Sequence, residues 1–182
     1  MGKAIGMIEF KTVASGITAA DAMVKTAEVE IIEAQTVCPG KYIAVITGDL
    51  SAVKAAVETA CAKYETQLID SFVLGNPHES IFPAIYGTTS VENISALGIL
   101  ETYDAASVIE AADIAAKTAI VELIELRIAK GMCGKSYMLL TGEVSAVEAA
   151  MEKAKAYLAE KGMYLDSSVI AHPDRKMCEK IL

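Results

Sequence analysis

Short apolar runs, each about the length of a strand, recur through the first half of the chain. Residues 5–10, 42–47 and 69–74 are such runs, bounded by turn-forming residues, and each predicts a β-strand. Residues 28–36 alternate apolar and polar positions and are rich in β-branched side chains, which also favours a strand. The Cys-Pro-Gly sequence at residues 38–40 predicts a turn between two of these strands.

Two stretches of the same half carry helical periodicity. Residues 18–27 predict a helix on whose surface Asp21 and Lys25, four residues apart, can pair. A second helix follows Gly48, with Asp49 or Ser51 as its N-cap. Its apolar positions at helical spacing are Val53, Val57, Ala60 and Tyr64. The predicted order is therefore β-α-β-β-α-β, a ferredoxin-like pattern.

The whole pattern then repeats. The segment 4–9 recurs at 96–101 and Lys25-Thr26-Ala27 at 117–119, both at an offset of 92 residues. Thr47-Gly48-Asp49 recurs as Thr141-Gly142-Glu143 at an offset of 94, and Asp70-Ser71 as Asp166-Ser167 at 96. The second copy therefore gains two residues between Glu125 and Gly134 and two more near Lys161-Gly162. We predict two tandem domains, residues 1–91 and 92–182, of the α/β (α+β) class, with helices packed on antiparallel sheets.

Composition and charge argue against several classes of function. Hydrophobic residues make up 53% of the chain and the mean hydropathy is +0.40, so we expect apolar surface to be buried against other subunits. The net charge of −8, with no basic run, argues against nucleic acid as a partner. We expect no membrane span and no signal peptide, hence a cytoplasmic protein whose cysteines are reduced. No phosphate-binding glycine loop or nucleophile–base pair is evident, so we expect no enzyme activity.

Several motifs, in this order, resemble the bacterial microcompartment (BMC) shell domain. They are the segment 6–9, Lys25-Thr26-Ala27, the Gly40 loop, Thr47-Gly48-Asp49 and Asn76-Pro77-His78. Two unpermuted copies resemble the tandem class of this family, whose members form trimers that imitate hexamers. The resemblance implies a homotrimer that tiles with hexameric shell proteins in a microcompartment shell.

The segment 36–41 is similar to the pore loop of the T-type shell proteins of propanediol utilisation, which hold an iron–sulfur cluster on the three-fold axis. The resemblance implies that Cys38 is a metal ligand and that Pro39 and Gly40, with Cys133 and Gly134 of the second copy, form pore loops. One cysteine cannot hold a cluster, whereas cyclic symmetry brings three together. The implied cofactor is one 4Fe-4S cluster per trimer, with an open ligand position on the fourth iron. Electron transfer across the shell to a redox partner enzyme would follow.

The other candidate residues are interpreted as structural groups or as contacts at the edge of the ring. For Cys133 a plain loop cysteine is favoured, with supplementary ligation left open, and Cys61 is interpreted as structural. Glu9 and Glu101, which repeat inside strands, are interpreted as structural hydrogen-bonding groups. By resemblance Lys25 and Lys117 are lattice-edge lysines that pack against neighbouring rings. Asn76 and His172 stand at edge positions where the family often has arginine.

Two alternatives stay open. One is a metal-free shell protein whose central pore, lined by the Gly40 and Gly134 loops, passes small metabolites. The other is a ferredoxin-like regulatory trimer that binds a small ligand between its subunits.

Overall fold

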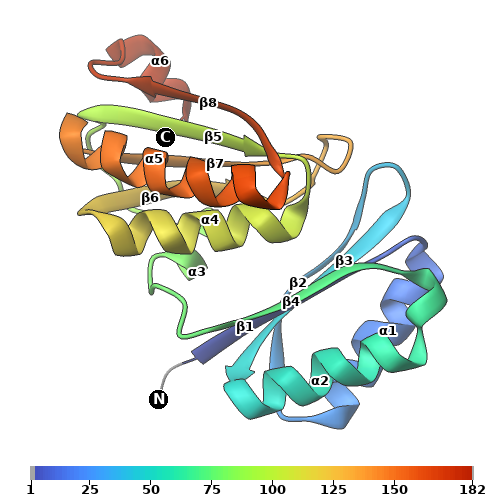
Figure 1. Cartoon of the computed structure of the whole chain (residues 1–182). Coiled ribbons are helices and arrows are strands. Elements are labelled where there is room, and N and C mark those ends of the chain that lie inside the picture. Colours follow the sequence, from blue (N-terminus) through green and yellow to red (C-terminus); the bar gives the residue numbers. More distant parts are fainter. Residues whose placement is uncertain (1–2, 182) are drawn as a thin grey trace. The chain divides into compact units, whose positions relative to one another are not determined.

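The computed structural model describes residues 3–181, which divide into two packing units (Figure 1). The first unit ends at Pro77 and the second begins at His78. The sequence repeats were predicted to meet between residues 91 and 92, and that boundary stays a prediction about the repeats. The packing units divide earlier, so the connecting segment 78–95 is grouped with the second unit.

The first unit is a four-stranded antiparallel sheet with the strand order β2-β3-β1-β4. Its elements are β1 (Lys3–Phe10), α1 (Val13–Thr26), β2 (Val29–Val37), β3 (Lys41–Asp49), α2 (Leu50–Lys63), a short 3-10 turn (Glu65–Gln67) and β4 (Leu68–Gly75). Helices α1 and α2 lie side by side against one face of this sheet (Figure 1). The predicted β-α-β-β-α-β order is confirmed.

Alternation along the strands divides the side chains of the first sheet between two faces. Ile8 and Phe10 of β1 and Ala44 and Ile46 of β3 point to the helices and form the core with them. Residues between these positions, including Glu9, therefore lie on the opposite face. Helix α1 approaches β3 closely at Gly16, where a Cβ atom would lie 2.4 Å from Cβ of Tyr42.

The predicted start of the first helix was wrong, whereas that of the second is confirmed. Helix α1 begins at Val13 rather than at residue 18, because the hydroxyl of Thr12 accepts the backbone N–H of Ser15 at 3.4 Å and caps the helix. Asp49 occupies the N-cap position of α2, as one of the two predicted alternatives, but its side chain makes no capping hydrogen bond.

The second unit repeats the architecture with the strand order β6-β7-β5-β8. Its elements are α3 (Ile81–Tyr86), β5 (Ala96–Thr102), α4 (Ala105–Thr118), β6 (Val121–Arg127), β7 (Ser136–Gly142), α5 (Val144–Lys161), β8 (Tyr164–Ile170) and α6 (Arg175–Ile181). The extra residues lie where the repeat offsets predicted them. Residues 128–135 connect β6 to β7, and α5 is longer than α2 and ends at Gly162 in the left-handed conformation.

None of the helices within residues 3–181 combines the length and the apolar character needed to cross a bilayer.

Candidate functional site

Cys38 lies at the tip of the β2–β3 hairpin. The strand pairing ends with Val37 opposite Lys41, and residues 38–40 form the connecting turn. The N–H of Gly40 donates to the carbonyl of Val37 at 3.0 Å, and Gly40 has φ +87°, a conformation that side chains strongly disfavour. Cys38 is partly exposed with a free thiol, and Pro39 and Gly40 are exposed. The hairpin therefore presents one thiol on a short, tight turn.

The base of this hairpin is tied to the central strand by a buried ion pair. Nζ of Lys41 donates to Oε1 of Glu9 at 2.9 Å, and the Glu9 side chain is only 3% exposed. The pair confirms the interpretation of Glu9 as a structural hydrogen-bonding group.

The β6–β7 connection of the second unit has a different construction. Its residues 128–135 replace a turn of three, and its backbone has positive φ at Ala129, Gly131, Cys133 and Gly134. The hydroxyl of Ser136 accepts the N–H of Ala129 at 3.0 Å, which closes the base of the loop. Cys133 is exposed, and Gly134 is buried.

Cys133 is not the counterpart of Cys38 within this loop. At the offset of 94 residues that pairs Gly40 with Gly134, Cys133 matches Pro39, and Met132 matches Cys38. The two cysteines therefore occupy the same loop in different positions.

The thiol of Cys38 is the right kind of ligand for iron, because iron–sulfur clusters are held by cysteine thiolates. Within residues 3–181 no group of three or more His, Cys, Asp or Glu side chains is placed to hold a metal ion. One chain therefore offers a single thiolate donor at this turn. The residues present fit a cluster only as one member of a set completed by other chains.

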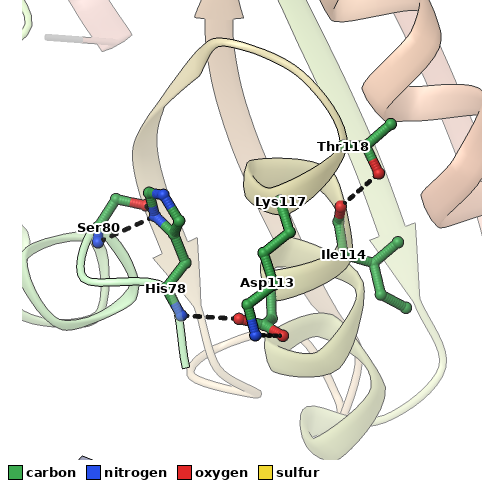
Figure 2. A network of polar contacts seen from close by, with 6 residues as sticks. All are labelled: His78, Ser80, Asp113, Ile114, Lys117 and Thr118. Carbon is green, nitrogen blue, oxygen red and sulfur yellow. Dashed lines mark hydrogen bonds and ion pairs between the residues drawn. The ribbon is translucent and has the colours of Figure 1, made fainter. Parts of the chain in front are cut away.

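The two predicted edge lysines have unlike surroundings. Lys25 pairs with Asp21 at 2.6 Å, as predicted, and the side chains are 72% and 53% exposed. Lys117 pairs with Asp113 at 2.7 Å, but the Asp113 side chain is only 6% exposed. Asp113 also accepts the backbone N–H of His78 at 2.7 Å, as Figure 2 shows. Asp113 thus fastens the segment leading into α3 onto α4.

Two of the remaining candidates follow strands, and Cys61 lies within helix α2. Asn76 follows β4 with φ +54°, and His172 is exposed in the bend after β8. Cys61 is half-buried against the core of the first unit, in keeping with a structural role. The edge roles of Lys25, Lys117, Asn76 and His172 stay predictions, since they concern contacts between rings.

Sequence reasoning missed a polar cluster on the second sheet. The hydroxyl of Tyr137 donates to Oε2 of Glu125 at 2.6 Å, and Arg127 donates to Oε1 through Nε at 3.0 Å and Nη2 at 2.5 Å. Burial and the bond to Glu125 raise the pKa of Tyr137 to about 12. The bond to Glu125 likewise raises the pKa of Arg127.

This cluster lines an open cavity of about 410 Å³. A comparison of the two repeats could have found it, because the first copy has Gln35 and Ile43 where the second has Arg127 and Tyr137. The departure of two neighbouring positions from their counterparts was the available signal.

Comparisons with known proteins all point to one family. A family model described as "BMC domain" matches residues 4–77 and 96–173. The chain is 40% identical over 182 residues to the bacterial microcompartment shell protein PduT of Citrobacter freundii, covering 100% of this chain and 99% of that protein. It is 38% identical over 88 residues to the carboxysome shell protein CsoS1 of Prochlorococcus marinus (strain SARG), covering 47% of this chain and 85% of that protein. A solved structure of a microcompartment protein from Desulfitobacterium hafniense superposes with a TM-score of 0.94 at 42% identity, covering 98% of this chain and 99% of that one.

Proposed function

The chain belongs to the family of bacterial microcompartment shell proteins with a BMC domain in each half, and from that premise we propose that three copies form a ring whose Cys38 thiolates bind one iron–sulfur cluster on the three-fold axis. Its role as a structural shell component follows from the family and from relatives that match almost end to end. The trimer, the cluster and electron transfer across the shell are the further content of the proposal.

The position of Cys38 carries this proposal. A free, partly exposed thiol stands at the tip of a hairpin, in a turn whose glycine has a conformation that other residues avoid. Exposed thiols are liable to oxidation unless they serve as ligands or reactive groups. Rotation about a three-fold axis turns one donor into three, which covers three irons of a four-iron cluster.

The chain's own residues would do two things at this site. Cys38 would bind iron as its thiolate, and the short turn would hold the sulfur in place. A bound cluster would supply one-electron transfer through a ring that it also plugs. We therefore place redox exchange at the ring centre and assembly with other shell proteins at the ring edges, where Lys25 is exposed beside Asp21.

Anaerobic purification followed by iron, sulfide and visible absorbance measurements tests the cluster. We expect about four iron atoms per three chains and a broad visible absorbance. Cys38→Ser should lose both, and Cys133→Ser, which changes the other exposed loop thiol, should keep both.

Three results would decide against parts of the proposal. A colourless anaerobic preparation that still assembles into sheets would favour the metal-free pore. A preparation in which Cys133→Ser loses iron as completely as Cys38→Ser would move the ligand set. A particle that is not trimeric by analytical ultracentrifugation would remove the symmetry on which the cluster depends.

A further inference from the structure

We propose that the buried Glu9–Lys41 ion pair is a positioning device for Cys38, which holds its hairpin against the central strand and sets the local charge next to the cluster. This inference rests on the proposed function for its second half, because the charge acts on a cluster. Its first half, the restraint of the hairpin, concerns the chain itself.

The pair lies directly beneath the turn. Lys41 is the residue opposite Val37 in the final strand pair, and Cys38 follows Val37 immediately. Only Pro39 and Gly40 lie between Cys38 and Lys41, so the Cα atoms of Cys38 and Lys41 are at most about 11 Å apart. The Lys41 side chain, at the start of β3, reaches to Glu9 on the neighbouring strand β1 and donates to it at 2.9 Å. The end of the hairpin is thereby fastened to the strand at the centre of the sheet.

Burial gives this contact its strength. The Glu9 side chain is 3% exposed and that of Lys41 is 29% exposed, so the pair is largely withdrawn from water. A buried carboxylate requires a partner, because leaving it unpaired incurs its full desolvation penalty. The strand neighbour directly opposite Glu9 on β4 is Asp70, another carboxylate, whose Oδ1 accepts the N–H of Ser71 at 2.8 Å. Lys41 is thus the cation that balances the buried carboxylate of Glu9 on this part of the sheet face.

The second unit provides an internal contrast. Its repeat counterparts are Glu101 and Lys135. Within the described residues 3–181 they form no ion pair, Glu101 is half-buried, and Lys135 is exposed in the loop before β7. The buried pair therefore occurs in the repeat whose hairpin carries Cys38, while the other repeat, with the same two residue types, builds its loop without it.

Charge reasoning predicts opposite effects for the two members of the pair. Lys41→Met leaves the negative charge of Glu9 unbalanced, which disfavours adding an electron to a nearby cluster and lowers its reduction potential. Glu9→Gln leaves the positive charge of Lys41 and raises the potential. The double variant Glu9→Gln/Lys41→Met has no net change in charge and should return close to the parent value. A merely structural role of the pair would not produce shifts of opposite sign that cancel.

The test uses the full-length chain with two readouts. Hydrogen exchange of the backbone around residues 38–41 measures the restraint, and we expect about tenfold faster exchange in Lys41→Met than in the parent. Lys135→Met is the matched control and should leave exchange in this hairpin unchanged. Redox titration of the anaerobically purified protein, followed by its visible absorbance, measures the potential in the parent, both single variants and the double variant.

The outcomes separate the two proposals. An iron-free parent protein would overturn the proposed cluster, while the exchange comparison would still decide whether the pair restrains the hairpin. If the parent holds a cluster and both single variants have the same reduction potential as the parent, the electrostatic half of the inference is overturned. Exchange in Lys41→Met no faster than in Lys135→Met would overturn the positioning half. Should Lys41→Met fold poorly, the double variant, which removes the buried charge as well, replaces it in the exchange comparison, and Glu9→Gln alone still tests the shift in potential.

Discussion

Asp21 and Asp113 occupy the same position in the two repeats, and their removal should have very different effects on stability. Each pairs with a lysine four residues later in its helix, at 2.6 Å and 2.7 Å. The sequence presents them as equals. The structure does not, since the Asp21 side chain is 53% exposed and that of Asp113 is 6% exposed.

The expected magnitudes follow from these surroundings. Asp21→Ala removes an exposed helical ion pair, which contributes about 0.3–0.5 kcal/mol. Asp113→Ala also removes the hydrogen bond from the N–H of His78, and a bond to a charged group contributes about 1.5–3 kcal/mol. The change in helix propensity is the same at both sites and cancels in the comparison. We expect Asp113→Ala to lower the free energy of unfolding by about 2–3 kcal/mol and Asp21→Ala to lower it by less than about 0.5 kcal/mol.

Thermal unfolding of both variants, at one protein concentration so that assembly is held constant, measures the difference. For a chain of this size, about 2–3 kcal/mol corresponds to a fall in Tm of about 4–12 °C. Asp113→Asn keeps an oxygen acceptor for the N–H of His78 and should fall between the parent and Asp113→Ala. Equal, small effects of Asp21→Ala and Asp113→Ala would show that the hydrogen bond from His78 to Asp113 adds nothing to the stability of the fold.

Two further predictions concern packing and pH. Gly16→Ala should destabilise the first unit by about 1–3 kcal/mol in chemical denaturation, because the new Cβ would meet the Tyr42 side chain at 2.4 Å; Gly75→Ala, whose Cβ would make contacts of 3.5 Å or more, is the control and should change little. Tyr137 should ionise near pH 12 in an ultraviolet titration, and Glu125→Gln should lower that value toward 10. Because the pKa of Tyr137 is raised in the folded state, its contribution to stability is complete below about pH 10 and is lost as pH rises toward 12. A titration of Tyr137 at its ordinary value would contradict the half-buried hydrogen bond to Glu125.

The architecture could be predicted from the sequence, because two independent patterns agreed. Strand and helix periodicities gave the β-α-β-β-α-β order, and the repetition at offsets of 92 to 96 residues showed that the order occurs twice. It also located the added residues of the second copy, since a shift in offset marks an insertion between two matched segments. The start of α1 was not predicted, because the Thr12 cap depends on a local hydrogen bond rather than on periodicity.

The candidate site was likewise predicted from the sequence only in part. The Cys-Pro-Gly sequence predicted the turn that carries Cys38, and the similarity of residues 36–41 to a known pore loop singled out Cys38 as a candidate ligand. The environment of charged residues could not be read that way. Glu9 and Glu101, Asp21 and Asp113, and Lys41 and Lys135 are matched pairs in the sequence, yet one member of each is more deeply buried or more tightly bonded than the other.

Tertiary structure decided these differences because burial depends on what the rest of the chain places over a residue. The segment that follows Pro77 brings the N–H of His78 to Asp113, and nothing equivalent precedes the first repeat within the described residues. The short turn after Val37 keeps Lys41 in strand pairing within reach of Glu9, whereas the longer loop before Ser136 leaves Lys135 outside its strand. A repeat in sequence fixes the backbone that is shared, and long-range packing sets the desolvation and the partners of each side chain on it.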